Sequence, residues 1–337
     1  MGGNALKHCT GRFSREKYAS VLEQITTDLK YLFPGIRVED IKFYEQKESF
    51  GDMDLLVSSS ALPSNWVHRL LQHWEPADHH KNGNVLSVEY DGIQVDLIVT
   101  KDEDFDSSAL YFAYNDLGNL MGRIAHKFGL KYGHEGLGYP FRDGDNLVCI
   151  IPITKDPEKI FSLLGYDYGR WQQGFKTLED IFEFTADTAF FNPSIYLLEN
   201  RNHIARMRDR KRASYTAFLS WCRERYPMMD NPEWRFYTFS EDKKTNLPYI
   251  FDNFPEFRES YNRVAAALER KKAVKLRFNG DLVRQITGRE GKDLGEFMTW
   301  LRKNGWEGGQ FEAWVLGASD EEIADEIRFF YEKWVNQ

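Results

Sequence analysis

Two kinds of hydrophobic pattern follow one another in the first part of the chain. Between Ser14 and Leu32 the apolar side chains recur at steps of three and four residues, which predicts an amphipathic helix. From Val38 the apolar positions come in short runs instead, which are typical of strands. The segments with this pattern are 54–57, 85–89 and 93–100. With a helix over 64–74 and a hairpin turn at Asp91-Gly92, this region predicts a small α/β sheet.

The remainder of the chain is predominantly helical in its pattern. Helices are predicted over 117–128, 156–164, 178–189, 194–212, 213–225, 257–272 and 320–335. A short strand is predicted over 147–152, and the Gly-rich segment 129–138 is expected to form turns. We therefore expect an α+β protein of two domains, with the sheet in residues 1–171 and a mostly helical domain in residues 172–337.

Composition limits the class of protein. With 337 residues and an apolar share of 42%, the chain has enough apolar side chains for two packed domains. The net charge of −8 argues against a surface that is basic throughout, although a local basic region would still attract phosphates. Three widely separated cysteines, Cys9, Cys149 and Cys222, exclude a disulfide framework. No apolar run is long enough to span a membrane, so we expect a cytoplasmic protein without a membrane partner.

Three aspartates carry the chemistry that the residues themselves indicate. Asp52 and Asp54 stand two positions apart at the start of a predicted strand, where such positions share one face. Asp96 lies inside an apolar run, where an isolated charge would be costly. Three converging carboxylates predict a site for two Mg²⁺ ions, with Mn²⁺ as an alternative. On the residues alone it stays open whether Asp52 only caps a turn and Asp54 is solvated.

The residues around these aspartates resemble a known superfamily. Glu48-Ser-Phe-Gly-Asp-Met-Asp-Leu-Leu-Val57 resembles the first metal motif of the DNA polymerase β-like nucleotidyltransferases, especially the family X polymerases. The residues that follow at that family's spacing are Asp96, Tyr111, Phe112, Asp116, Asn119 and Arg123. The resemblance covers roughly residues 38–171 and implies a palm and a thumb.

The resemblance implies metal and phosphate ligands. Asp52 and Asp54 would bind both metal ions, and Asp96 would act beside the primer 3′ hydroxyl. The triphosphate would lie against Ser49, the backbone N–H of Gly51 and a lysine. That lysine is expected because Ile41-Lys42 stands where family members usually carry Gly-Ser, and either Lys42 or Lys47 would supply the positive charge.

The resemblance also implies a pocket for the sugar and the base. Tyr111 and Phe112 would line the sugar pocket, Asp116 would lie against the incoming base, and Asn119 would hydrogen-bond the minor-groove edge of that base. Arg123 would reach the paired or neighbouring base. Ala113-Tyr114 stands where a Gly-containing turn is usual, so the choice between ribose and deoxyribose stays open.

The second half adds features of a nucleic-acid-binding domain. The segments 201–212 and 263–277 each hold six lysines and arginines against one acid, which is typical of a phosphate-tracking surface or of a solvated helix face. Gly280-Asp-Leu and the turn Gly291–Gly295 resemble the helical tail of bacterial tRNA nucleotidyltransferases and poly(A) polymerases. That resemblance implies contact with phosphate or RNA.

Together these resemblances imply an enzyme that adds a nucleoside monophosphate from ATP or another NTP to the 3′ hydroxyl of a nucleic acid. We expect little or no use of a template, and RNA such as tRNA as the acceptor. One alternative is a family X-like DNA polymerase or terminal transferase that uses dNTPs. A non-catalytic nucleic-acid-binding relative and transfer to a protein or small molecule are the others.

Overall fold

The structure is a computed structural model that describes residues 5–6, 11–230, 242–306 and 310–336. The protein is α+β, and its packing divides it into two compact units, residues 1–254 and 255–337. The division does not lie near residue 172, where the hydrophobic pattern changes. The helices between residues 172 and 254 belong to the first unit instead; there the Tyr196 hydroxyl donates to the carbonyl of Leu120 at 3.2 Å.

A mixed five-stranded sheet forms the centre of the first unit, in the order β2-β4-β7-β6-β5. Its strands are β2 (Val38–Asp40), β4 (Met53–Ser58), β5 (His79–Asn82), β6 (Val85–Tyr90) and β7 (Ile93–Thr100). β4 and β7 are parallel, and the other neighbours are antiparallel. The predicted β6–β7 hairpin is confirmed, because Asp91 and Gly92 adopt the positive φ angles of 51° and 77° that its tight turn requires.

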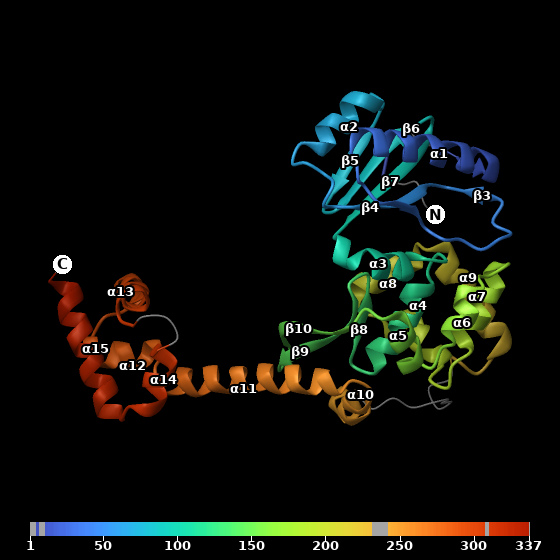
Figure 1. Cartoon of the computed structure of the whole chain (residues 1–337). Coiled ribbons are helices and arrows are strands. Elements are labelled where there is room, and N and C mark those ends of the chain that lie inside the picture. The colour runs from blue at the N-terminus through green and yellow to red at the C-terminus, as the bar shows by residue number, and fades with distance from the viewer. Residues whose placement is uncertain (1–4, 7–10, 231–241, 307–309, 337) are drawn as a thin grey trace. The chain divides into compact units, whose positions relative to one another are not determined.

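The two faces of this sheet have different roles. Helices α1 (Arg15–Leu32) and α2 (Trp66–Trp74) cover one face (Figure 1), and the Ser14 side chain caps α1 by accepting a hydrogen bond from the backbone N–H of Lys17. Met53, Leu55 and Val57 of β4 point into the core beneath these helices. Because side chains alternate along a strand, Asp54 and Leu56 lie on the opposite face, where Leu56 packs against Phe105.

The remaining helices of the first unit come after the strands of this sheet in the sequence. They are α3 (Phe105–Phe112), α4 (Leu117–Lys127), α5 (Pro157–Leu163), α6 (Tyr168–Gln172), α7 (Leu178–Ala186), α8 (His203–Arg210), α9 (Ala213–Arg225) and α10 (Leu247–Asn253). Four short 3₁₀ helices accompany them: η1 (Asp102–Asp104), η2 (Pro193–Tyr196), η3 (Leu198–Asn200) and η4 (Lys243–Asn246). The single helix predicted over 194–212 is wrong. Asn192 and Asn202 cap separate segments there, so η2, η3 and α8 replace it.

Two further sheets complete the first unit. β1 (Phe13–Ser14) pairs with β3 (Ser49–Phe50) just before the two aspartates of β4. β8 (Lys131–Gly133), β9 (Gly136–Asp143) and β10 (Asn146–Thr154) form an antiparallel sheet. The segment 129–138 is therefore not merely a turn region as predicted. Its glycines mask the alternation of a strand, although its backbone groups pair across the sheet.

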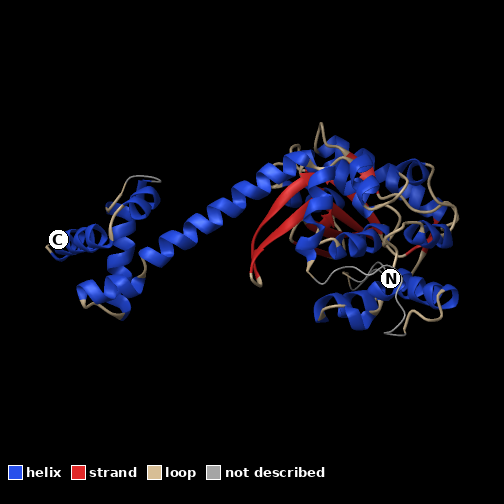
Figure 2. Ribbon diagram, turned by 90° about the horizontal axis from the view of Figure 1, so that it is seen from below, coloured by secondary structure: helices blue, strands red, loops and turns tan. Residues whose placement is uncertain are grey.

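In the second unit, all regular secondary structure of the described residues is helical (Figure 2). Its helices are α11 (Pro255–Arg277), α12 (Gly280–Thr287), α13 (Gly291–Asn304), α14 (Gln310–Gly317) and α15 (Asp320–Val335). Val283, Phe297 and Ile327 form the centre of its own core. Throughout the described part of the chain, every helix is too short or too polar to cross a bilayer.

Candidate active site

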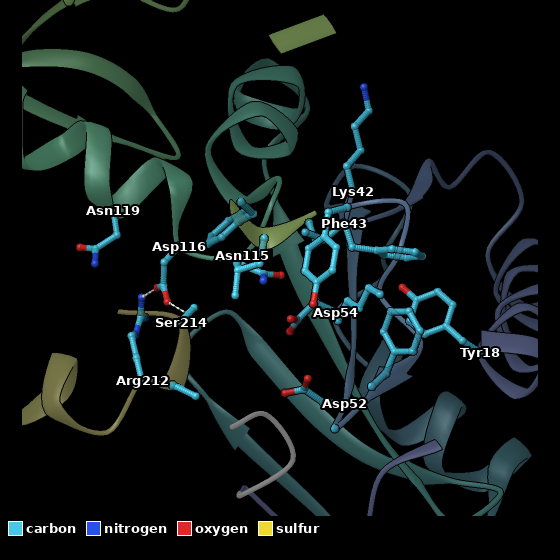
Figure 3. A pocket seen from close by; sticks show the side chains of 18 of the residues that line it. Tyr18, Lys42, Phe43, Asp52, Asp54, Asn115, Asp116, Asn119, Arg212 and Ser214 are labelled. Atoms are coloured by element: carbon cyan, nitrogen blue, oxygen red, sulfur yellow. Dashed lines mark hydrogen bonds and ion pairs between the residues drawn. The ribbon is translucent and has the colours of Figure 1, made fainter. Parts of the chain in front are cut away.

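The three predicted aspartates meet on the face of the sheet that α1 and α2 leave uncovered. Asp54 of β4 lies directly opposite Asp96 of β7 in the parallel register, and Asp52 precedes Asp54 by two positions. Each of the three offers a carboxylate oxygen within 4.8 Å of the others. Figure 3 shows the carboxylates of Asp52 and Asp54 directed toward the same cavity. The arrangement is a compact set of oxygen donors.

Burial and mutual repulsion shape the electrostatics of this cluster. Burial raises the pKa of Asp54, and the negative charges of Asp52 and Asp96 raise it further. Burial also raises the pKa of Asp96, although hydrogen bonds from Ser87 and Gln94 oppose the shift. The Gln94 Nε2 group donates to both Asp96 oxygens, at 3.0 and 3.1 Å. A nearby positive charge would therefore stabilise the cluster.

A cavity of about 620 Å³ opens beside the aspartates. Its sheet side is lined by Lys47, Gly51, Asp52 and Asp54, and its other side by residues of α3, α4 and α9 and the segments before them. Those residues include Tyr111, Phe112, Asp116, Asn119, Arg212 and Ser214. A space of this size accommodates a ligand as large as a nucleotide.

The predicted triphosphate contacts are only partly brought together. Gly51 lines the cavity, whereas Ser49 does not; its hydroxyl accepts a hydrogen bond at 2.8 Å from Nε of Arg12, which is itself a lining residue. Lys42 also lines the cavity, but its ammonium lies 4.9 Å from the centroid of the Trp171 ring, and Figure 3 shows this side chain pointing away from the aspartates.

Of the two lysines that the sequence offers for the triphosphate contact, Lys47 lies nearer to the charges of the aspartates. Its ammonium lies 4.5 Å from the centroid of the Phe50 ring and lines the cavity. The charges of Asp52 and Asp54 act on this ammonium, and burial lowers its pKa. Lys47, and not Lys42, is therefore the lysine that faces the acidic cluster.

Two aromatic residues form one wall of the cavity, as expected for Tyr111 and Phe112. Their ring centroids lie 5.4 Å apart, with the rings nearly perpendicular. The turn after them uses Tyr114 and Asn115, both in the left-handed region, with φ angles of 59° and 61°. Tyr114 is an unusual residue in this conformation. Its ring packs edge-on against Phe175, with the ring centroids 4.7 Å apart. This tertiary contact stabilises a turn for which a glycine was expected.

Asp116 and Asn119 stand at the beginning of α4 and are held by later segments. Asp116 forms an ion pair with Arg212 and accepts a hydrogen bond from Ser214 (Figure 3). The Asn119 Oδ1 atom accepts a hydrogen bond from Arg208 Nη2 at 3.1 Å, whereas its buried Nδ2 group has no partner among the described residues. Asn119 also lines the cavity, so a buried amide donor without a partner among the described residues belongs to a residue of its wall.

Arg123 does not reach the cavity. Its side chain is buried and donates from Nε and Nη2 to the carbonyl of Ile195, at 3.3 and 2.8 Å. Burial lowers the pKa of its guanidinium. In this structure the residue secures η2 against α4, which is not the contact with a base that the resemblance implies.

The basic segment 201–212 is used largely inside the protein. Arg201 forms a buried ion pair with Asp209 at 2.8 Å, and Arg208 contacts both Asp209 and Asn119. Arg212 pairs with Asp116. These contacts leave less free charge for tracking phosphates than the sequence predicts. Arg212 and Ser214 were missed as cavity residues, because only the fold brings them to Asp116.

The site is defined by an acidic cluster on two parallel strands and by a cavity with aromatic and amide groups on its far side. Comparisons of the sequence with models of known protein families and with curated proteins find no match.

Proposed function

We propose that this chain is a metal-dependent nucleotidyltransferase with a polymerase β-like palm and thumb. It adds a nucleoside monophosphate from an NTP to the 3′ hydroxyl of a nucleic acid, with RNA such as tRNA as the favoured acceptor. The convergence of Asp52, Asp54 and Asp96 beside the cavity carries this proposal. Residues 1–171 would supply the catalytic palm and thumb, the later helices of the first unit would complete the nucleotide pocket, and residues 255–337 would bind the nucleic acid.

The donor set fits Mg²⁺ or Mn²⁺. Carboxylate oxygens are the ligands that such hard cations prefer. Burial and the charges of Asp52 and Asp96 raise the pKa of Asp54, and a bound cation would offset that repulsion. Asp52 and Asp54 would hold both ions, and Asp96 would hold the ion next to the acceptor. When bound, two such ions lower the pKa of the attacking hydroxyl and neutralise the leaving pyrophosphate.

The side chains of the cavity position the reactants. The acceptor 3′ oxygen bonds to the α-phosphorus while the bond to the pyrophosphate oxygen breaks, and the hydroxyl proton leaves through Asp96 to solvent. Gln94 keeps both Asp96 oxygens in place for this role. Lys47 would face the triphosphate, and Tyr111 and Phe112 would flank the sugar and exclude water from it.

Incubation of the full chain with Mg²⁺ and labelled NTPs or dNTPs tests this proposal. The acceptors are tRNA and primed DNA. We expect label from NTPs on the 3′ end of tRNA without a template, and no label with Asp54→Asn or Asp96→Asn. Label that enters only primed, template-matched DNA would replace the RNA acceptor with DNA. If Asp54→Asn and Asp96→Asn left every transfer activity unchanged, catalysis by this cluster would be rejected.

The placement of Arg123 bears on the DNA polymerase alternative. In the sequence, that alternative rested on Asn119 and Arg123 as contacts to the base pair. Because Arg123 is committed to the Ile195 carbonyl, only Asn119 remains in the cavity. This arrangement favours an enzyme that reads the incoming base without a template.

A further inference from the structure

A group of positive side chains gathers at the C-terminal end of α4, away from the aspartates in sequence. His126 and Lys127 occupy the last turn of α4, and η4 brings Lys243 against them. The Lys243 Nζ atom lies 3.3 Å from the His126 Nε2 atom. Lys127 and Lys243 are both half-buried. We call His126, Lys127 and Lys243 the α4 cation cluster.

Within the described part of the chain, no carboxylate pairs with the two lysines of this cluster. Neither Lys127 nor Lys243 has an acidic side chain of the described residues within ion-pair distance. Asp242, the residue before Lys243, accepts a hydrogen bond from the backbone N–H of Lys244 at 2.9 Å instead. The nearby Arg123 adds a third positive charge, and its guanidinium is used by the Ile195 carbonyl.

The ionisation of these groups reflects the excess of positive charge. Burial lowers the pKa of His126 to about 4, and the charges of Lys243, Arg123, Lys127 and Arg201 contribute. Burial and neighbouring cations also lower the pKa of Lys127 and of Lys243. His126 is therefore neutral near pH 7 and can donate one N–H, while the two ammonium groups repel each other.

The helix dipole explains only part of this arrangement. The partial negative charge at a helix C-terminus stabilises cations in the last turn, which accounts for Lys127. It gives no reason for Lys243, which comes from a segment 117 residues away from His126 in sequence. Bringing a third basic group onto this pair costs electrostatic energy unless an anion binds between them.

We propose that the α4 cation cluster binds a phosphate group, and that its ligand is a backbone phosphate of the acceptor strand. The choice of ligand rests on the proposed transferase function. α4 has 11 residues, so at ~1.5 Å per residue it spans about 16 Å. Asp116 and Asn119, at its other end, belong to the cavity. A strand with its 3′ end at the aspartates would reach the cluster a few nucleotides upstream.

Two substitutions in the full chain test the site. The double variant Lys127→Gln with Lys243→Gln removes the two ammonium groups. The matched control is Lys17→Gln with Lys131→Gln, because those lysines are already paired with Asp91 and Glu135. Binding of a fluorescent single-stranded RNA oligonucleotide is followed by anisotropy at several salt concentrations.

We expect the dissociation constant of the double variant to rise at least tenfold at low salt. The slope of log K against log salt should fall by about 0.7, the value for one phosphate contact of a single strand. The control should stay within about twofold of the parent protein. Parental affinity and slope in the double variant would overturn the proposal.

Inorganic phosphate separates the sources of the ligand. A rise in unfolding temperature with phosphate, lost in the double variant, would support a site that also accepts free phosphate. An effect with the oligonucleotide alone would support backbone phosphate. Phosphate binding without any change in oligonucleotide binding would overturn the assignment to the acceptor strand.

The unfolding temperature without ligand tests whether Lys127 and Lys243 only stabilise the fold. Without ligand, the double variant should unfold at the same or a higher temperature, because repulsion has been removed; a lower temperature would contradict the charge argument. Transfer activity separates the two proposals. If the parent transfers nucleotides and the double variant binds RNA normally, only this inference fails. If RNA binding falls in a chain that transfers nothing, the transferase proposal fails and the site remains.

Discussion

Asp54 and Asp96 occupy directly opposed positions on the parallel strands β4 and β7, and their carboxylates lie within 4.8 Å of each other and of Asp52. This register brings like charges together on a partly buried surface. Such an arrangement lowers the stability of the protein on its own and favours the binding of a divalent cation. The predictions below follow from it and from the cavity beside it.

Asp54→Asn should stabilise the metal-free protein and abolish its response to Mg²⁺. Removal of one carboxylate relieves the repulsion, and we expect the free energy of unfolding at pH 7.5 to rise by about 1 kcal/mol. The parent should gain several degrees of unfolding temperature with Mg²⁺, and the variant none. Thermal unfolding with and without Mg²⁺ measures both effects. Equal Mg²⁺ responses in the two proteins would show that the cluster is not the metal site.

The stability of the metal-free protein should depend on pH through the same carboxylates. Folding raises the pKa of Asp54 and of Asp96 above the usual carboxyl value, so the folded state binds more protons than the unfolded state above about pH 4. Their contribution is therefore fully present at low pH and is lost as the pH rises through the folded-state pKa. The difference in unfolding free energy between Asp54→Asn and the parent should grow between pH 5 and pH 8, and the total increase should not exceed about 3 kcal/mol. Denaturant titrations at each pH check this, and an advantage that shrinks with pH would refute it.

Lys47→Gln and Lys42→Gln form a matched pair for the triphosphate contact. Both lysines line the cavity, but the charges of Asp52 and Asp54 act on Lys47, whereas the Lys42 ammonium lies over the Trp171 ring and points away from the aspartates. We expect Lys47→Gln to raise the KM for the NTP by about tenfold or more, since a charge-assisted contact is worth ~1.5–3 kcal/mol. Lys42→Gln should change KM less than about threefold. Steady-state kinetics of the two variants measure both KM values. A larger rise in KM for Lys42→Gln than for Lys47→Gln would make Lys42 the phosphate ligand.

Asn119→Ala should weaken the choice among bases. Among the described residues its buried Nδ2 donor has no partner, and its Oδ1 atom is used by Arg208, so the hydrogen bond from Nδ2 to the base is the contact that would distinguish the NTPs. We expect kcat/KM for the preferred NTP to fall by about tenfold, and the values for the other NTPs to change less. Competition between the four NTPs measures the selectivity. Uniform loss for all four would mean that Asn119 only supports the pocket.

Arg123→Met should act on stability and not on base choice. The substitution leaves the buried Ile195 carbonyl without its donor, which costs about 1–3 kcal/mol of unfolding free energy. The KM for each NTP should stay near that of the parent at temperatures where the variant is folded. Denaturant unfolding and kinetics measured together test this, and a shift in base preference would return Arg123 to the nucleotide pocket.

Local patterns in the sequence were sufficient for several elements. The three- and four-residue spacing of apolar side chains predicted α1, and Asp91-Gly92 predicted the β6–β7 turn. In both cases neighbouring residues determine the outcome through backbone preferences and side-chain periodicity. The same period of two placed Asp52 and Asp54 on one side of β4.

Which residues far apart in the sequence come into contact depends on how the strands and helices pack. The parallel pairing of β4 with β7 set Asp54 against Asp96, and the packing of α8 and α9 on α4 brought Arg208 to Asn119 and Arg212 to Asp116. Sequence spacing determines the face on which a side chain lies, because that is a local property of the backbone. The identity of the facing residue depends on how whole elements bury their apolar surfaces, and this is why Arg123 is directed into the protein interior and Lys47 faces the aspartates.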